Sequence, residues 1–255
     1  MFRAFNLQAS LEQRPQSLYE AGFKLKEAHA AKVRSTLESF LNNNGIVDAS
    51  WMQSEWFPQI NAQVFISHSH KDEENALLLA GWLSELGLNA FVDSSVWGHA
   101  GDLLKLIDNV FCLNDDKQTY SYESRNGSTS HVHMLLVTAL AKMIDNTECI
   151  FFLNTPNSIN SKEAVDKTKS PWIFAEIAMM EMVRRRTKES HREQTKFAER
   201  VAKHETRARF QAEYTIDLTS LTPLSGAMFG QWKEQWRSKL PRRNALDVLY
   251  TLVPE

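Results

Sequence analysis

One stretch decides the fold, and it reads Gln63-Val64-Phe65-Ile66-Ser67-His68-Ser69-His70-Lys71-Asp72. Three apolar, β-forming residues lead directly into small and polar residues, and a helical pattern opens at Asp72. A buried strand that ends in a polar loop just before a helix is where open α/β sheets bind ligands, at the carboxyl ends of the strands. The stretch therefore predicts a strand of a parallel sheet and one wall of a binding site.

Strands and helices are predicted to alternate along the rest of the chain. Helices are expected at 72–86, 102–110, 130–145, from Ser170 through the charged run 184–209, and from Gly230. Further strands are expected at 88–93, 149–154 and 214–218, and residues 112–129 read as turns with a small hairpin near Tyr120. Such alternation favours an α/β fold with a parallel sheet between layers of helices.

Residues 1–60 are predicted to form an N-terminal helical extension in front of a domain that spans 61–255. A capping box, Ser17 to Glu20, precedes apolar residues at helical spacing, and the polar run 42–45 ends that pattern. Packing against the main domain is one interpretation of this extension. An arm for oligomerisation or for binding a partner is the other.

The composition excludes several classes of protein. The 255 residues are 43% hydrophobic with a net charge of −2, so the chain can bury a core and has no overall basic field for nucleic acid. Two cysteines argue against a disulfide scaffold and for a reducing compartment. No secretion signal or long apolar run is evident, so we expect a cytoplasmic protein without a membrane span. Phosphate-binding loops of the G-x-x-x-x-G-K-[ST] type and G-x-S-x-G elbows do not occur.

Four segments, taken together and in order, resemble the TIR (Toll/interleukin-1 receptor) domain family. They are Val64–Ser69 with Lys71 and Asp72, then Phe91-Val92-Asp93 with a loop containing Gly98 and Gly101, then Cys149–Asn154, and finally Ser170-Pro171-Trp172 through Glu176. The resemblance covers about residues 63–240. The chain departs from the family by an insertion at about 112–145, by the N-terminal extension, and by Ile173 at a position often occupied by cysteine.

The resemblance implies a flavodoxin-like sheet and a site that cleaves NAD+. Glu176 matches the family's catalytic glutamate, and cleavage through an oxocarbenium-like transition state explains why a carboxylate is useful there. The substrate contacts that it implies are Ser67, His68, Ser69, Lys71, Asp93, Trp97 and Trp172. Structural alternatives remain open for the catalytic residue and two of the contacts: Glu176 as a paired buried acid, Trp172 as core, and Asp93 as a cap of the following loop.

Two other features have competing interpretations. There are two His-x-His pairs, His68 with His70 and His131 with His133, and such pairs can chelate a metal in an extended segment. No Cys-x-x-Cys or His-Glu-x-x-His spacing accompanies them, so no metal site is predicted. His131 and His133 are alternatively contacts of the substrate. The run Arg184–Arg209 is rich in Lys and Arg and reads as a solvated helix, or as a patch for nucleic acid or a partner.

The leading expectation is an NAD+ nucleosidase, cyclase or transferase of the prokaryotic, standalone TIR type, which the resemblance links to anti-phage defence. NAD+ is its substrate, and no cofactor is needed. Self-association through TIR surfaces and a separate effector or sensor protein are the expected partners; membrane and nucleic acid are not. The alternatives are a non-catalytic TIR scaffold and a nucleotide sensor that binds without turnover.

Overall fold

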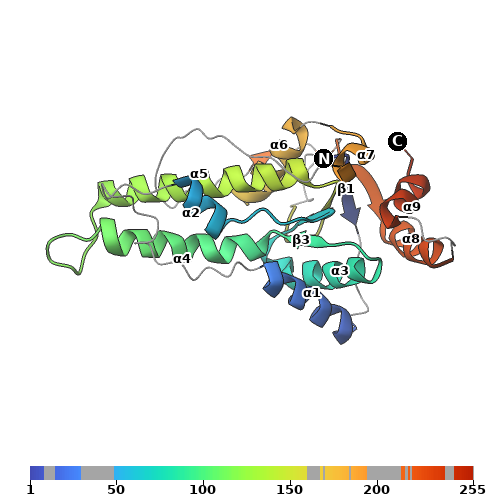
Figure 1. Cartoon of the computed structure of the whole chain (residues 1–255), viewed down its shortest axis with the longest axis horizontal. Helices are drawn as coiled ribbons and strands as arrows, with labels where there is room; N and C mark the ends of the chain where they lie inside the picture. Colours follow the sequence, from blue (N-terminus) through green and yellow to red (C-terminus); the bar gives the residue numbers. More distant parts are fainter. Residues whose placement is uncertain are drawn as a thin grey trace.

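The computed structural model describes residues 1–8, 15–29, 49–159, 167–168, 170–183, 185–193, 214–215, 218, 220–238 and 244–254. Within helix α4, only the backbone of residues 94–99 is described. The centre of the molecule is a five-stranded, all-parallel sheet with the order β3-β2-β4-β1-β7 (Figure 1). Its strands are β1 (Arg3–Gln8), β2 (Val64–Ser67), β3 (Ala90–Val92), β4 (Cys149–Leu153) and β7 (Thr222–Ser225). The predicted α/β fold with a flavodoxin-like sheet is therefore confirmed.

Helices cover both faces of this sheet because both faces are apolar. Neighbouring residues of a strand point to opposite sides, so Phe65 packs in one core and Ile66 in the other. The first core is closed by α2 (Ala49–Trp56), α4 (Ser94–Phe111), α5 (Tyr122–Asn146) and α6 (Pro171–Met182). The second is closed by α3 (Glu73–Glu85), α8 (Gly226–Ser238) and α9 (Ala245–Leu252).

The sequence analysis expected an N-terminal helical extension, but the first residues of the chain belong to the central sheet instead. Strand β1 lies inside the sheet, where Phe5 pairs with Phe151 on one side and with Thr222 on the other. The Arg3 guanidinium is buried and donates to the Val253 carbonyl oxygen. Arg3 and Asn6 interrupt the apolar pattern, and this hid a short buried strand. The helices expected in this region are present as α1 (Gln16–His29) and α2, whereas residues 30–48 lie outside the described part.

Helix α1 lies directly on α3, and two glycines allow the close approach. A side chain at Gly22 would collide with the backbone of Leu77, and one at Gly81 would collide with the backbone of Leu18. The short 3₁₀ helix η2 (His70–Asp72) leads from the polar exit of β2 into α3. Helix α3 itself is confirmed as predicted.

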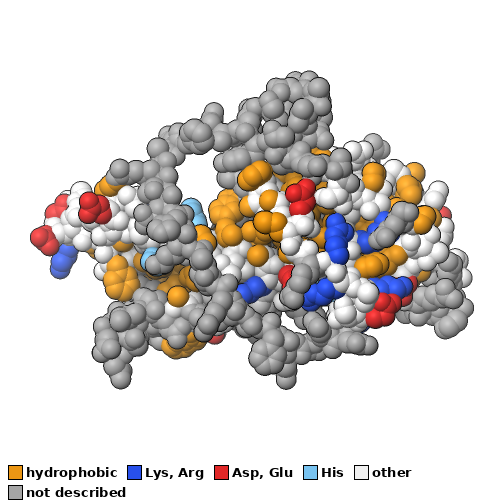
Figure 2. All heavy atoms as spheres, turned by 90° about the horizontal axis from the view of Figure 1, so that it is seen from above, with side chains coloured by type: hydrophobic (Ala, Val, Ile, Leu, Met, Phe, Trp, Pro, Cys, Tyr) orange, Lys and Arg blue, Asp and Glu red, His pale blue; other side chains and the backbone are white. Residues whose placement is uncertain are grey.

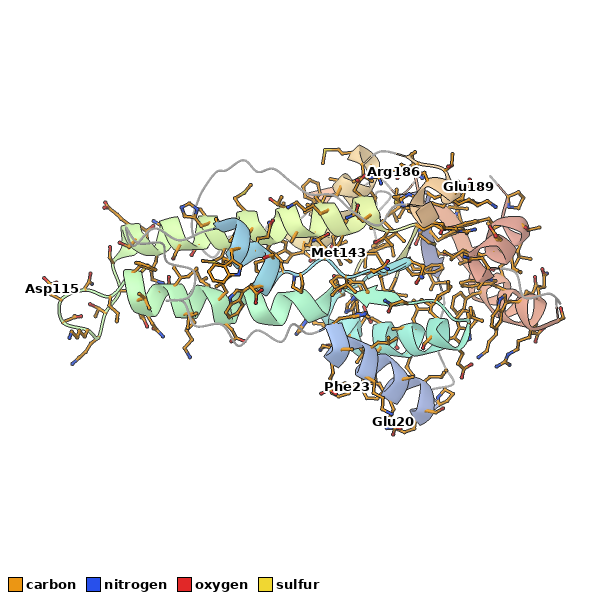
Figure 3. The ribbon with its side chains drawn as sticks, viewed as in Figure 1. Glu20, Phe23, Asp115, Met143, Arg186 and Glu189 are labelled. Atoms are coloured by element: carbon orange, nitrogen blue, oxygen red, sulfur yellow. The ribbon has the colours of Figure 1, made fainter. Side chains whose placement is uncertain are left out.

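The region from 94 to 146 is a long antiparallel helical hairpin, formed by α4 and α5, that projects away from the sheet (Figures 1 and 3). The loop predicted at 94–101 is wrong, because α4 begins at Ser94, directly after β3. The predicted small hairpin is a single bridge between Leu113 and Tyr120, beside the tip where Figure 3 marks Asp115. Asp108 ties the two helices together by accepting from Arg125 Nε (2.8 Å) and Ser128 Oγ (2.6 Å).

The C-terminal third differs from the predicted single charged helix. Helix α6 ends at Met182, and α7 (Lys188–Glu193) is separate; residues 194–209 lie outside the described part. Tyr214–Thr215 (β6) pairs antiparallel with Lys167–Thr168 (β5), apart from the main sheet. The fifth strand of that sheet is β7, whose Pro223 suits an edge position. None of the described helices is long and apolar enough to cross a bilayer.

Candidate functional site

Ser67, His68, Asp93 and Glu176 meet at the carboxyl edge of the sheet, and we refer to them as the acid cluster. Ser67 is the last residue of β2, and Asp93 directly follows the neighbouring parallel strand β3. Glu176 comes from α6, which starts after Ser170 with Pro171 in its first turn; the Ser170 hydroxyl accepts from the Ile173 amide. The sequence analysis named all four residues, and the structure brings them together.

The acid cluster is deeply buried and tightly connected. Ser67 Oγ donates to Glu176 Oε2 at 2.6 Å, and His68 Nδ1 lies 2.5 Å from Asp93 Oδ1. The exposed fraction is 0% for Ser67 and Glu176, 3% for Asp93 and 4% for His68. Asp93 stands at the N-cap of α4 but makes no capping hydrogen bond with its side chain. Its carboxyl group lies beside His68 instead.

Burial raises the pKa of Glu176 well above its usual range, and the charge of Asp93 raises it further. The hydrogen bond from Ser67 acts in the opposite direction but is outweighed. The raised pKa favours the protonated, neutral form of Glu176.

Burial acts to lower the pKa of His68, but the charge and hydrogen bond of Asp93 outweigh it, so the pKa of His68 is raised. The Ile66 carbonyl and the charge of Glu73 add to this effect. The raised pKa favours the charged form of His68, which lies beside the Asp93 carboxyl group. His68 Nε2 has no hydrogen-bond partner among the described residues.

The remaining predicted contacts do not belong to the acid cluster. Trp172 lies one turn before Glu176 on α6, half-buried, with the ring of His133 on α5 edge-on to it at 5.7 Å between centroids. Ser69 is half-buried and Lys71 is exposed. Trp97 lies on α4, where only the backbone is described.

A second polar group, which sequence analysis did not assign to a site, joins the segments that follow β2 and β4. Asp72 is buried and accepts from Thr155 Oγ1 (2.5 Å) and from Asn157 Nδ2 (2.9 Å) in the loop after β4. Ser158 Oγ closes that loop by donating to the Leu153 carbonyl oxygen. The turn-forming sequence 154–158, placed directly after a buried strand, was the signal for it.

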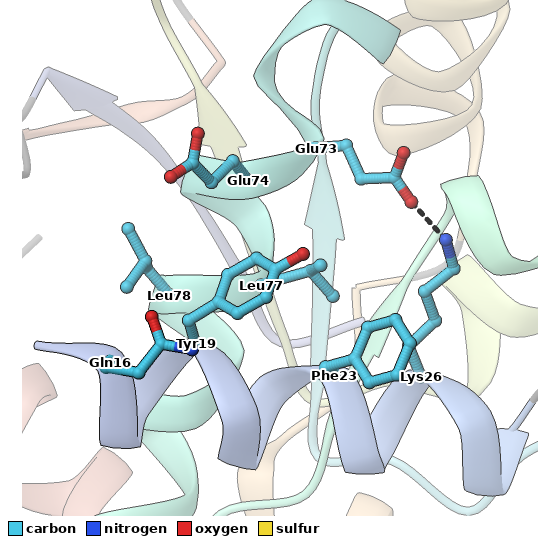
Figure 4. A pocket seen from close by; sticks show the side chains of 8 residues that line it. All are labelled: Gln16, Tyr19, Phe23, Lys26, Glu73, Glu74, Leu77 and Leu78. Atoms are coloured by element: carbon cyan, nitrogen blue, oxygen red, sulfur yellow. Dashed lines mark hydrogen bonds and ion pairs between the residues drawn. The ribbon is translucent and has the colours of Figure 1, made fainter. Parts of the chain in front are cut away.

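A cavity of about 470 Å³ lies elsewhere, between α1 and α3 (Figure 4). Tyr19 and Phe23 form one wall, and the ion pair of Lys26 with Glu73 crosses one end. The complete lining is Gln16, Tyr19, Phe23, Lys26, Glu73, Glu74, Leu77 and Leu78. No member of the acid cluster lines this cavity, so it is not the access route to Glu176.

The histidine pairs are not arranged for a metal. His68 is buried whereas His70 is exposed, and His131 and His133 lie on helix α5, where residues two apart point in different directions. Within the described residues, no group of three or more His, Cys, Asp or Glu side chains is placed to hold a metal ion. Cys112 and Cys149 are buried thiols and are not joined in a disulfide.

The described part of the basic run is engaged within the protein. Arg186 pairs with Asp145, Lys188 Nζ lies 2.8 Å from Asp247 Oδ1, and Arg192 makes two bonds to the buried carboxylate of Glu148 at 2.8 and 3.0 Å. Figure 2 shows Lys and Arg side chains gathered in the half of the molecule where Figure 1 places α7, and Figure 3 marks Arg186 and Glu189 there. These cations hold the segment 185–193 against the amino edge of the sheet.

No family model, curated protein or solved structure matches this chain.

Proposed function

We propose that this protein cleaves the bond between nicotinamide and ribose in NAD+, with Glu176 as the catalytic residue. The observation that carries the proposal is the meeting of Glu176 with the polar ends of β2 and β3 at the carboxyl edge of a parallel sheet. Ligands of open α/β sheets bind at this edge. The order of the motifs, which resembles that of the TIR family, supports the same assignment.

The main catalytic group that the reaction requires from the protein is one well-placed carboxylate. Nicotinamide leaves as a neutral group, so no strong acid is required to protonate it. Positive charge develops on the ribose as the bond breaks, and an ionised Glu176 facing that charge would stabilise the transition state. Trp172, one turn away and half-buried, offers a flat apolar wall for a ring, and His68 Nε2 is a donor for a ribose or phosphate oxygen.

Because Glu176 is buried, the proposed reaction requires a conformational change before NAD+ can bind. Because its side chain is inaccessible, NAD+ reaches it only after a conformational change that uncovers the acid cluster. The proposal therefore includes an activation step, for which self-association or a separate sensor protein supplies the binding energy. An intracellular role in anti-phage defence, by depletion of NAD+ or by production of a cyclic or derivatised ADP-ribose signal, belongs to the same proposal.

The test is to incubate the concentrated protein with NAD+ and to measure nicotinamide and the ribosyl products by chromatography. Glu176→Ala is expected to lower the rate by about 100-fold or more. Glu181→Gln, an exposed glutamate on the same helix, is the matched control and is expected to retain full activity. Nicotinamide release that is equal in Glu176→Ala and the unmodified protein would contradict the assignment. Free ADP-ribose identifies a hydrolase, and a cyclic product identifies a signal synthase.

The same burial favours a second candidate function, in which Glu176 is a structural acid and the protein binds nucleotides or other copies of itself without turnover. For this second function we expect saturable NAD+ binding, measured by calorimetry, without any nicotinamide release under conditions of self-association. Glu176→Ala would then weaken binding or assembly and leave no activity to lose.

A further inference from the structure

The cavity between α1 and α3 has the size of a ligand pocket and is separate from the acid cluster. Its volume is about 470 Å³. Pockets that hold small molecules have volumes of about 300–1,000 Å³. The two helices that form its walls approach each other backbone to backbone at Gly22 and Gly81, which leaves them little freedom to slide. We therefore expect the cavity to keep its shape.

The α1 side of the cavity is aromatic, and the α3 side contributes aliphatic side chains. The rings of Tyr19 and Phe23 both line the cavity and lie nearly parallel, with 6.3 Å between their centroids and 20° between their planes. Leu77 and Leu78 are buried and line it from α3. A flat or aliphatic body bound here would lose water against apolar atoms from both helices.

The polar side chains of the cavity favour a cation over an anion. Glu73 and Glu74 come from the first turn of α3, and both line the cavity. Lys26 is the one cation among the described residues that line it, and it reaches across from α1 to pair with Glu73 (Figure 4). Aromatic rings attract cations, and carboxylates accept strong hydrogen bonds from them. A bound phosphate or carboxylate would instead meet like charges.

We propose that this cavity binds a small organic cation, which is an ammonium or guanidinium group carried on a flat or aliphatic body. The body lies against Tyr19, Phe23 and the two leucines, and the cationic group lies beside Glu74. A free amine and the side chain of a lysine or arginine in a peptide share this chemistry. The site does not depend on the cleavage of NAD+, so it stands even if that proposal fails.

The experiment is a calorimetric titration of the full chain with 2-phenylethylammonium chloride at pH 7, without NAD+. Saturable binding to one site is expected, and the methyl resonances of Leu77 and Leu78 should shift in NMR spectra of leucine-labelled protein. Uncharged 2-phenylethanol and the anion 3-phenylpropionate have a similar body and should bind at least about 10-fold more weakly. Absence of saturable binding, or equal binding of the three probes, would overturn the proposal.

Two variants separate the contribution of the ring from that of the charge. Phe23→Leu keeps an apolar side chain but removes a ring, and it should weaken binding of the ammonium probe by about 3-fold or more. Glu74→Gln removes a carboxylate and should weaken it by about 10-fold, without a change for 2-phenylethanol. Both side chains are exposed, so we expect the variants to fold, which thermal unfolding without the probe verifies. An affinity that is unchanged in either variant would contradict the proposed site.

Phe111→Leu and Glu27→Gln are the matched controls, since Phe111 on α4 and Glu27 on α1 are exposed and lie outside the cavity lining. Both should bind the probe as the unmodified protein does, and losses equal to those of the cavity variants would also overturn the proposal.

The two sources of the cation are distinguished by a titration with Nα-acetylarginine amide. Binding tighter than that of 2-phenylethylammonium identifies a peptide side chain as the ligand, and weaker binding identifies a free amine. Either result supports the shared chemistry, provided that the cavity variants weaken it and the controls do not.

Discussion

At the scale of single residues, the raised pKa of Glu176 makes the free energy of unfolding depend on pH. Its folded-state pKa lies above the usual 4.5, so the unfolded chain ionises first as the pH rises. The stability from this group is fully present below about pH 4.5 and is lost as the pH rises toward the folded-state pKa. At neutral pH the native protein therefore bears a free-energy cost for keeping Glu176 neutral.

We expect Glu176→Gln to remove that cost. The glutamine side chain has nearly the same shape as glutamate and its oxygen can still accept from Ser67, so the packing is retained. The variant should be more stable than the unmodified protein at pH 7 by about 1 kcal/mol or more, and the difference should shrink toward pH 4.5. Thermal unfolding across this pH range measures the difference.

Glu181→Gln, exposed on the same helix, is the control and should show no pH-dependent gain. A difference between Glu176→Gln and the unmodified protein that stays constant with pH would mean that Glu176 is not held neutral in the native state.

At the scale of elements, the contact of α1 with α3 depends on two glycines. An alanine at position 81 would force its methyl group into the backbone of Leu18, and backbone cannot move aside as a side chain can. We expect Gly81→Ala to destabilise the protein by about 1–3 kcal/mol, measured by urea unfolding. Gly101→Ala on α4, where an added methyl group meets nothing within 4 Å, should instead stabilise by about 0.5–1 kcal/mol.

The helical hairpin has its own internal anchor, the buried carboxylate of Asp108. Asp108→Ala would leave Arg125 and Ser128 without their acceptor and is expected to cost about 1–3 kcal/mol. Hydrogen exchange should then accelerate in residues 109–125, near the tip marked by Asp115 in Figure 3, while the strands keep their protection. Asp115→Ala, exposed at that tip, is the control and should leave exchange elsewhere in the hairpin unchanged.

Strands with a continuous apolar sequence were predicted correctly, whereas strands that form only by pairing with neighbouring strands were missed. The run 149–153 and the strand at 64–67 are continuous apolar segments, so their place in a parallel sheet followed from the sequence. Strands β1 and β7 were missed because Arg3, Asn6 and Pro223 obscure them, and only pairing with neighbours makes them strands. The meeting of the β2 exit with Glu176 was foreseen, but the pairing of His68 with Asp93 requires the strand order and side-chain directions, which no sequence pattern encodes.

At the scale of the whole molecule, β1 makes the first residues of the chain part of the central sheet. Phe5 is fully buried and its ring stacks on Phe151 at 5.6 Å between centroids. We expect Phe5→Ala to lower the free energy of unfolding by about 3–5 kcal/mol. Gln8→Ala, exposed at the end of the same strand, should change it by less than about 0.5 kcal/mol. Denaturant unfolding followed by tryptophan fluorescence would report both, and a mild effect of Phe5→Ala would argue that the sheet is stable without β1.

The position of β1 also has a consequence for synthesis on the ribosome. This strand leaves the exit tunnel long before the two strands that flank it, because β4 with Phe151 and β7 with Thr222 are translated far later. Throughout that interval the apolar side chains of β1 have no sheet to join and are open to chaperones and to aggregation. The nascent chain can complete its sheet only after β7 has emerged from the tunnel.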